Sequence, residues 1–166
     1  LRLKNFGEKI NFVPTMGNLH AGHLSLVREA KKDKHICLVS IFVNPLQFNN
    51  SNDYKKYPRT EELDRSLLSK EKVDLLYLPN LELVSKDNFT YSLGDISKKL
   101  CGIDRKGHFQ GVAKVIIKFL RIINPHCIYL GEKDFQQTLI IKKIVKDLNF
   151  NTKVVVVPTV RDKNKI

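Results

Sequence analysis

The chain has 166 residues, a length that suits one domain with a substantial buried core. Its 29 Lys and Arg residues outnumber 17 Asp and Glu residues, and the resulting net charge of +12 suggests a nucleic-acid or anionic-membrane partner. The lysines are dispersed, however, which favours a solvated basic surface. No membrane-length apolar run, secretory signal or low-complexity segment is visible, so we expect a cytoplasmic protein.

Strand-like and helix-like patterns alternate along the chain. Strands are predicted at residues 10–14, 36–43, 75–78, 127–130 and 154–157. Helices are predicted at residues 22–33, 59–70, 112–123 and 135–148. Residues 88–99 predict only a short strand at 89–92 and a helical turn around 95–100.

The strands are continuous apolar runs, which is typical of strands covered on both faces. Their alternation with helices predicts an α/β fold with a Rossmann-like, doubly wound parallel sheet, which binds ligands beyond the carboxyl ends of its strands. Three cysteines, Cys37, Cys101 and Cys127, are odd in number and lack metal-site spacing. We expect them to be buried, reduced thiols.

The most informative segment lies between the first strand and the first helix. There His20, Ala21, Gly22 and His23 place two imidazoles at the first turn of a helix, where free backbone N–H groups and the helix dipole attract phosphate. A second such turn, residues 131–134, follows the strand at 127–130. Lys133 can pair with phosphate there, and Asp134 can cap the following helix.

Other polar residues follow the ends of strands or precede helices. Gln47 and Gln137 carry amides that suit a substrate with hydroxyls and a carboxylate, and Asn44 can present a third amide at the same edge. Arg105 is a candidate partner for carboxylate or phosphate, whereas His108 is equally compatible with a structural role. We expect Arg59 to anchor its loop and Thr60 to cap the next helix.

The His-x-Gly-His motif resembles the signature of nucleotidyltransferase-type Rossmann enzymes. Together with residues 43–48, 57–60, 107–112, 131–137 and 157–161, it resembles, in the same order, blocks of the pantothenate synthetase (pantoate–β-alanine ligase) family. The resemblance extends from about residue 7 to residue 161. It implies an ATP-dependent ligase of coenzyme A biosynthesis that joins (R)-pantoate to β-alanine through pantoyl adenylate, releasing pyrophosphate and AMP.

The resemblance also assigns roles to individual residues. It implies catalytic roles for His23, as proton donor, for His20 and for Lys133. It implies ATP binding by Met16, Gly17, Asn18, Leu19, His20, Ala21, Gly22, His23, Gly131, Glu132, Lys133, Asp134 and Val160, the last through main-chain groups. It implies pantoate binding by Gln47 and Gln137, to which we add Arg105 and Asn44 as candidates, and β-alanine binding by Gln47. ATP is expected to enter with Mg²⁺, but no acidic cluster indicates metal ligands. The family also implies a homodimer.

Family members continue past the position of Arg161 into a loop that closes over the ATP phosphates and a small C-terminal domain. We therefore expect residues 1–166 to be the N-terminal ATP- and pantoate-binding domain, with the C-terminal lid domain absent from this chain. Alone, these residues are expected to bind ATP and pantoate weakly and to turn over slowly, since a missing phosphate donor costs about 10²–10³ in rate.

Two other functions remain open from the sequence. A related transferase could use phosphopantetheine or nicotinamide mononucleotide as acceptor, but such acceptors carry phosphate and favour basic residues at the positions of Gln47 and Gln137. A basic nucleic-acid-binding module would bind oligonucleotides with a steep salt dependence. The absence of a recognised module or aromatic platform disfavours it.

Overall fold

The computed structural model describes residues 8–86, 89–98 and 100–161, apart from the side chain of residue 98. Its centre is a parallel sheet of five strands in the order β3-β2-β1-β4-β5. The strands are β1 (Ile10–Thr15), β2 (Ile36–Ile41), β3 (Leu75–Tyr77), β4 (Cys127–Gly131) and β5 (Lys153–Val157). This order confirms the predicted doubly wound α/β fold, because the chain moves outward from β1 in one direction and then restarts beside β1 with β4.

Helices connect the strands. The longer ones are α1 (Ala21–Ala30), α3 (Glu61–Lys70), α6 (His108–Ile123) and α7 (Phe135–Asp147). The shorter ones are α2 (Ser51–Lys56), α4 (Glu82–Ser85) and α5 (Cys101–Asp104). Three 3₁₀ turns complete the described part of the chain: η1 (Pro45–Gln47), η2 (Gly94–Lys98) and η3 (Glu132–Asp134).

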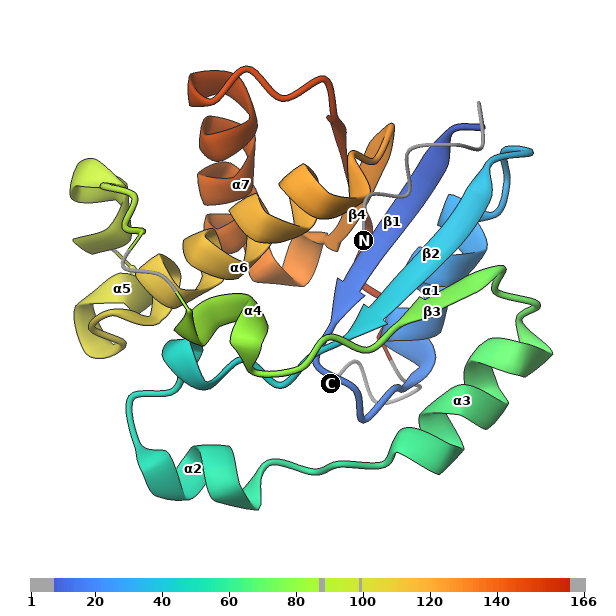
Figure 1. Ribbon diagram of the computed structural model, residues 1–166, viewed down its shortest axis with the longest axis horizontal. Helices are drawn as coiled ribbons and strands as arrows, with labels where there is room; N and C mark the ends of the chain where they lie inside the picture. The colour runs from blue at the N-terminus through green and yellow to red at the C-terminus, as the bar shows by residue number, and fades with distance from the viewer. Residues whose placement is uncertain (1–7, 87–88, 99, 162–166) are drawn as a thin grey trace.

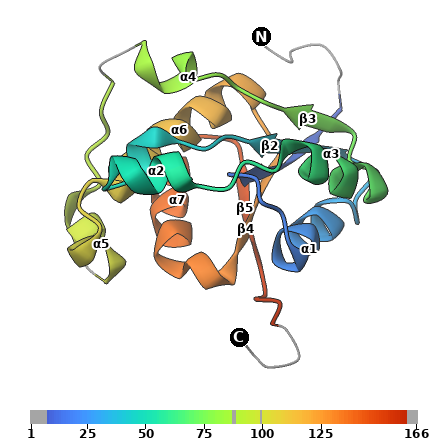
Figure 2. The same cartoon turned by 90° about the horizontal axis from the view of Figure 1, so that it is seen from below.

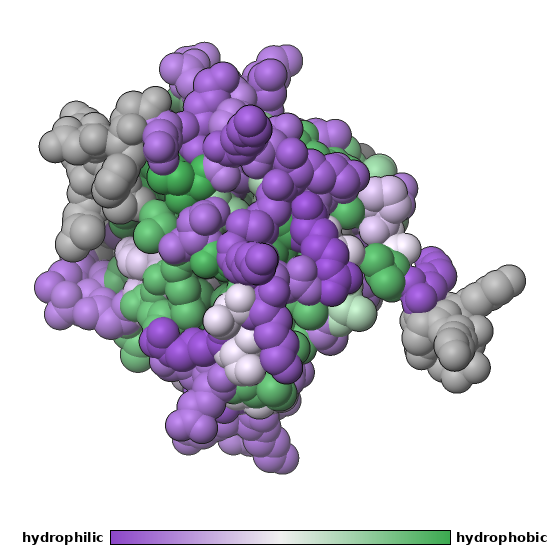
Figure 3. All heavy atoms as spheres, turned by 90° about the vertical axis from the view of Figure 1, so that its right-hand side faces the viewer, coloured by the Kyte–Doolittle hydropathy of each residue, from purple (hydrophilic) through white to green (hydrophobic). Residues whose placement is uncertain are grey.

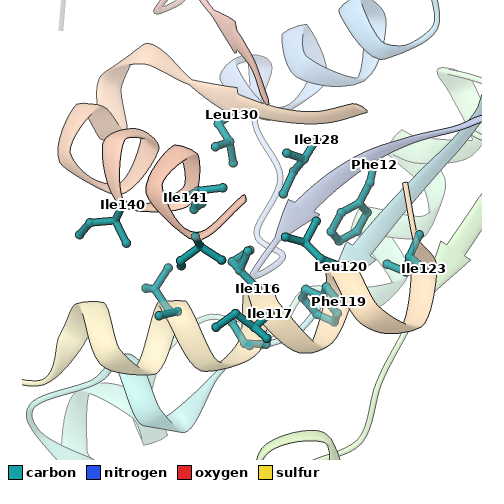
Figure 4. Close-up of a cluster of buried hydrophobic side chains, with 14 of the residues drawn as sticks. Phe12, Ile116, Ile117, Phe119, Leu120, Ile123, Ile128, Leu130, Ile140 and Ile141 are labelled. Atoms are coloured by element: carbon teal, nitrogen blue, oxygen red, sulfur yellow. The ribbon is translucent and has the colours of Figure 1, made fainter. Parts of the chain in front are cut away.

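Alternating strand residues supply two apolar cores, one on each face of the sheet. Phe12 and Ile128 pack with α6 and α7, whereas their neighbours Val13 and Tyr129 pack with α1. Helices α6 and α7 accordingly lie on one side of the sheet and α1 on the other (Figures 1 and 2). Figure 4 shows side chains from β1, α6, β4 and α7 pointing toward one another in the first core. Both faces are therefore covered, as the continuous apolar runs predict.

All five predicted strands and all four predicted helices are present, with shifted ends. The largest shift is in α6, which begins at His108 rather than at Val112. The residue before it, Gly107, adopts a left-handed conformation (φ 80°) that separates the helix from the preceding segment. The turn near residue 95 is found as η2, but the predicted strand at 89–92 is wrong. The short helices α2, α4 and α5 were not predicted, since none is long enough to show a helical period.

The surface is largely hydrophilic on the face shown in Figure 3, where hydrophobic side chains appear in several smaller areas among the hydrophilic ones. Among the residues described, no helix has the length and apolar character needed to cross a membrane. Cys37 and Cys127 are buried free thiols, and burial raises the pKa of Cys37 to about 11. The prediction of burial is wrong for Cys101, which is exposed at the start of α5.

Candidate active site

A cavity of about 470 Å³ lies beyond the carboxyl ends of β1 and β4. These adjacent strands lead into helices on opposite faces of the sheet, and such a switch point is where open α/β sheets bind ligands. The cavity brings together eight of the predicted site residues: Met16, His23, Asn44, Gln47, Arg105, Lys133, Asp134 and Gln137. The other predicted residues, Gly17, Asn18, Leu19, His20, Ala21, Gly22, Gly131, Glu132 and Val160, do not line it.

His20 and His23 cap the N-terminus of α1 reciprocally. Nδ1 of His20 accepts from the backbone N–H of Gly22 at 3.1 Å, and Nδ1 of His23 accepts from that of His20 at 3.4 Å. Their ring centroids are 4.1 Å apart. Gly22 leaves room for this arrangement, because a Cβ there would lie 2.9 Å from Cε1 of His20. The third position of the motif must therefore be small to allow the two histidines to cap the helix.

The same cap fixes where the histidine protons lie. Because each Nδ1 accepts a hydrogen bond, the proton of each neutral ring is on Nε2. Burial, reinforced by His20 and Lys133 and opposed by Asp64, lowers the pKa of His23 to about 4. In the structure His23 is therefore a neutral N–H donor at pH 7, so charge assistance in a bond to phosphate comes from the phosphate. No carboxylate occupies the first turn of α1 to compete for that anion.

The lowered pKa predicts a pH-dependent stability. An unfolded histidine has a pKa near 6.5, whereas that of folded His23 is about 4, so between these values the unfolded state binds more protons. The contribution of His23 to the free energy of unfolding should be complete above pH 6.5 and should decrease as the pH is lowered toward 4. Urea denaturation at pH 7 and pH 4.5 measures this loss, which should be smaller in His23→Asn. Equal losses in the two proteins would contradict the prediction.

Asp64 of α3 holds the loop that precedes α1. Its carboxylate is buried and accepts from the backbone N–H groups of Asn18 (3.0 Å) and Leu19 (2.8 Å). The Thr60 hydroxyl lies 3.2 Å from the same carboxylate, so Thr60 occupies the N-cap position of α3 without capping the helix, and that prediction is wrong. Asp64 was not among the predicted site residues. A signal was available, since an Asp four residues before the buried Leu68 lies on the core face of the helix.

Asn44 and Gln47 form a connected group at the end of β2. The Asn44 amide donates to Oε1 of Gln47 (3.1 Å) and to the Gly111 carbonyl (3.0 Å), while its oxygen accepts from the Leu46 N–H. Nε2 of Gln47 contacts the Met16 sulfur at 2.9 Å. Gly111 permits η1 to pack directly on α6, because a Cβ there would lie 2.2 Å from the Leu46 carbonyl oxygen. Asn44 is thus committed to orienting Gln47.

The turn after β4 faces the first loop across the cavity. Lys133 is exposed, lies near enough to His23 to lower its pKa, and forms no ion pair with another described residue. Asp134 precedes α7 without a side-chain cap, so its predicted capping role is wrong. Its backbone (φ −93°, ψ 48°) lies outside the extended region that N-cap residues usually adopt. Asp134 instead lines the cavity.

Two further basic residues have different roles. Arg105 ends α5, lines the cavity and forms no ion pair within the described part of the chain, so its charge is available to an anion. Arg59 donates to the carbonyls of Tyr54, Lys55 and Tyr57 and lies over the Tyr54 ring. This confirms its predicted role as a loop anchor.

Taken together, the switch-point cavity, the helix N-terminus capped by histidines and the free basic groups define an α/β protein of the Rossmann type with a site suited to an anionic ligand. A model of the pantoate–β-alanine ligase family matches residues 1–166, and the chain belongs to that family.

Relatives and solved structures agree with this assignment. The chain is 52% identical to pantothenate synthetase of Sulfurihydrogenibium sp., over 98% of this chain and 59% of the relative. The corresponding enzyme of Thermodesulfovibrio yellowstonii is 49% identical, over 99% and 59%. Pantothenate synthetase of Thermus thermophilus superimposes with a TM-score of 0.90 at 44% identity, over 95% of this chain and 58% of that one.

A further structure is of pantoate–β-alanine ligase from Francisella tularensis, complexed with βγ ATP and β-alanine. It matches with a TM-score of 0.91 at 45% identity, over 95% of this chain and 61% of that one. The chain therefore spans about three fifths of the length of these relatives.

Proposed function

We propose that this chain is the ATP- and pantoate-binding domain of a ligase that condenses (R)-pantoate with β-alanine to give pantothenate. In the first step a pantoate carboxylate oxygen attacks the α-phosphorus of ATP, forming pantoyl adenylate and releasing pyrophosphate. In the second step the β-alanine amine attacks the acyl carbon and releases AMP. The observation that carries the proposal is the convergence of His23, Lys133, Gln47 and Gln137 on one switch-point cavity.

The first step brings two anions together, so the site must supply donors and positive charge. In the proposal, His23 donates from Nε2 to a phosphate oxygen, and Lys133 stabilises the leaving pyrophosphate. His20 and the loop residues around it supply the helix N-terminus that holds the nucleotide. Residues 131–134 contact the nucleotide from the second turn, and the main chain at Val160 contacts adenine.

Pantoate and β-alanine are assigned to the amide side of the cavity. Gln47 and Gln137 bind the hydroxyls and carboxylate of pantoate, Gln47 also contacts β-alanine, and Arg105 pairs with a carboxylate. Asn44 contributes by holding the Gln47 amide, because its own amide hydrogens are already used. The Gln137 amide has no hydrogen-bond partner among the described residues and is available to substrate.

Magnesium is proposed to enter as the ATP complex. No group of three His, Cys, Asp or Glu side chains in the described part of the chain is arranged to hold a metal ion. This fits a cation bound chiefly through the phosphates, since Mg²⁺ keeps several waters and needs few protein ligands. We further propose that the enzyme acts in the cytoplasm as a homodimer.

Substrate dependence tests the proposal. The natural full-length protein is incubated with ATP, Mg²⁺ and pantoate, and pyrophosphate and pantoyl adenylate are measured before and after β-alanine is added. We expect pyrophosphate release to require pantoate, and pantothenate and AMP to appear only with β-alanine. Release that ignores pantoate but follows phosphopantetheine or nicotinamide mononucleotide would overturn the substrate assignment. The 166-residue chain is assayed in parallel and is expected to be much slower.

A further inference from the structure

His108, the first residue of α6, has a ring proton whose position the structure fixes. Its Nδ1 lies 2.7 Å from the backbone carbonyl oxygen of Gln47. A carbonyl oxygen only accepts, so Nδ1 carries the proton and donates it. In the neutral ring, Nε2 therefore has a free lone pair. The side chain is buried and lines the same cavity as Gln47, and the described part of the chain gives Nε2 no hydrogen-bond partner.

The surroundings keep this lone pair unprotonated at pH 7. Burial, assisted by the positive charge of Arg105, lowers the pKa of His108 from its ordinary value of 6.5. The hydrogen bond to the Gln47 carbonyl and the charge of Asp134 act in the opposite direction without reversing the shift. The groups that face His108 from α5, η1 and η3 are thus Arg105, the Gln47 carbonyl and Asp134.

The two cavity-lining histidines consequently have opposite polarity. His23 accepts at Nδ1 and presents Nε2–H as a donor, whereas His108 donates at Nδ1 and presents Nε2 as an acceptor. A donor suits phosphate. An acceptor suits an amine or ammonium group, and in the proposed reaction the amine of β-alanine is the nucleophile that must lose a proton.

We propose that Nε2 of His108 is the catalytic base of the second half-reaction, an assignment that rests on the proposed function. The neutral amine of β-alanine attacks the acyl carbon of pantoyl adenylate, and a C–N bond forms that leaves the nitrogen positively charged. One proton of that nitrogen passes to Nε2 of His108. The bond between the acyl carbon and the phosphate oxygen then breaks, its electron pair stays on that oxygen, and AMP leaves.

The test separates the two half-reactions in the full-length protein. His108→Asn places an amide N–H near the position of Nδ1, so it can keep the bond to the Gln47 carbonyl while removing the Nε2 base. We expect adenylate formation from ATP and pantoate to be nearly unchanged. Single-turnover transfer of the preformed adenylate to β-alanine should slow by about 10²-fold or more. His126→Asn, the same substitution at the opposite end of β4, is the matched control and should leave both steps unchanged.

The pH profile gives a readout that a structural role would not move. In the wild type, the rate of transfer to β-alanine should show a decrease below pH 6.5 that is caused by protonation of His108. This decrease should be absent in His108→Asn. A folded variant with wild-type transfer and an unchanged profile would overturn the assignment. Should the variant not fold, a wild-type profile without this decrease overturns it. Failure of the wild type to form adenylate would overturn the proposed function, and the assignment with it.

Discussion

Replacing His23 by alanine in the full-length protein is expected to lower pantoate-dependent pyrophosphate release by about 10²–10³-fold, the usual cost of removing one donor from developing charge. The reason is the loss of the Nε2–H donor at the start of α1, inside the switch-point cavity. The measurement is the rate of pyrophosphate release at saturating ATP and pantoate. A decrease of less than a few fold would contradict the role of His23 in the first step.

Two further variants separate the possible causes. His23→Asn retains a side-chain oxygen that can accept from the His20 N–H, so it preserves the helix cap without the Nε2–H donor. We expect it to be as slow as His23→Ala. Recovery of activity in His23→Asn would mean that the cap, rather than the donor, matters. His126→Ala makes the same change at the other end of β4 and should release pyrophosphate at the wild-type rate.

Replacing Asp64 by alanine should lower the free energy of unfolding by about 1–3 kcal/mol, the cost of one buried backbone donor left without its acceptor. The N–H of Leu19 would be stranded in a buried site, whereas that of Asn18, which is partly exposed, can turn to water. Because the loop before α1 loses its connection to α3, the affinity for ATP should also fall. Urea denaturation and nucleotide titration measure the two effects.

The control for Asp64 is Glu62→Ala on the same helix. Glu62 is exposed and near the start of α3. Its replacement removes the same charge without leaving a buried donor unpaired. Its effect should remain within about 0.5 kcal/mol. If Asp64→Ala were as mild as Glu62→Ala, the carboxylate would not be holding the loop.

The sheet and its helices were predictable because they depend on patterns that are local in the sequence. Each strand is a short apolar run and each long helix shows an apolar face. The pattern of apolar residues therefore predicts that both sides of the sheet are buried. The placement of the site followed from the same patterns. Residues that end adjacent parallel strands, such as His23 after β1 and Lys133 after β4, must meet at one edge.

The contacts that orient the site were not predictable in this way. Asp64 reaches the loop before α1 across 45 residues of sequence, and His108 reaches the Gln47 carbonyl across 61. Such contacts depend on how helices pack, which no local pattern contains. The failed capping prediction for Thr60 has a more local cause, because its hydroxyl contacts the Asp64 carboxylate instead of the free N–H groups of its own helix.

The proton positions of the cavity histidines depend on main-chain atoms alone. The partner of His23 is the N–H group of His20, and the partner of His108 is the carbonyl of Gln47. Side chains elsewhere in the cavity can therefore change without altering which imidazole donates and which accepts. A redesign for a different acid or amine could replace the amide of Gln47 and keep this division intact, so the scaffold separates the recognition of a substrate from the handling of its protons.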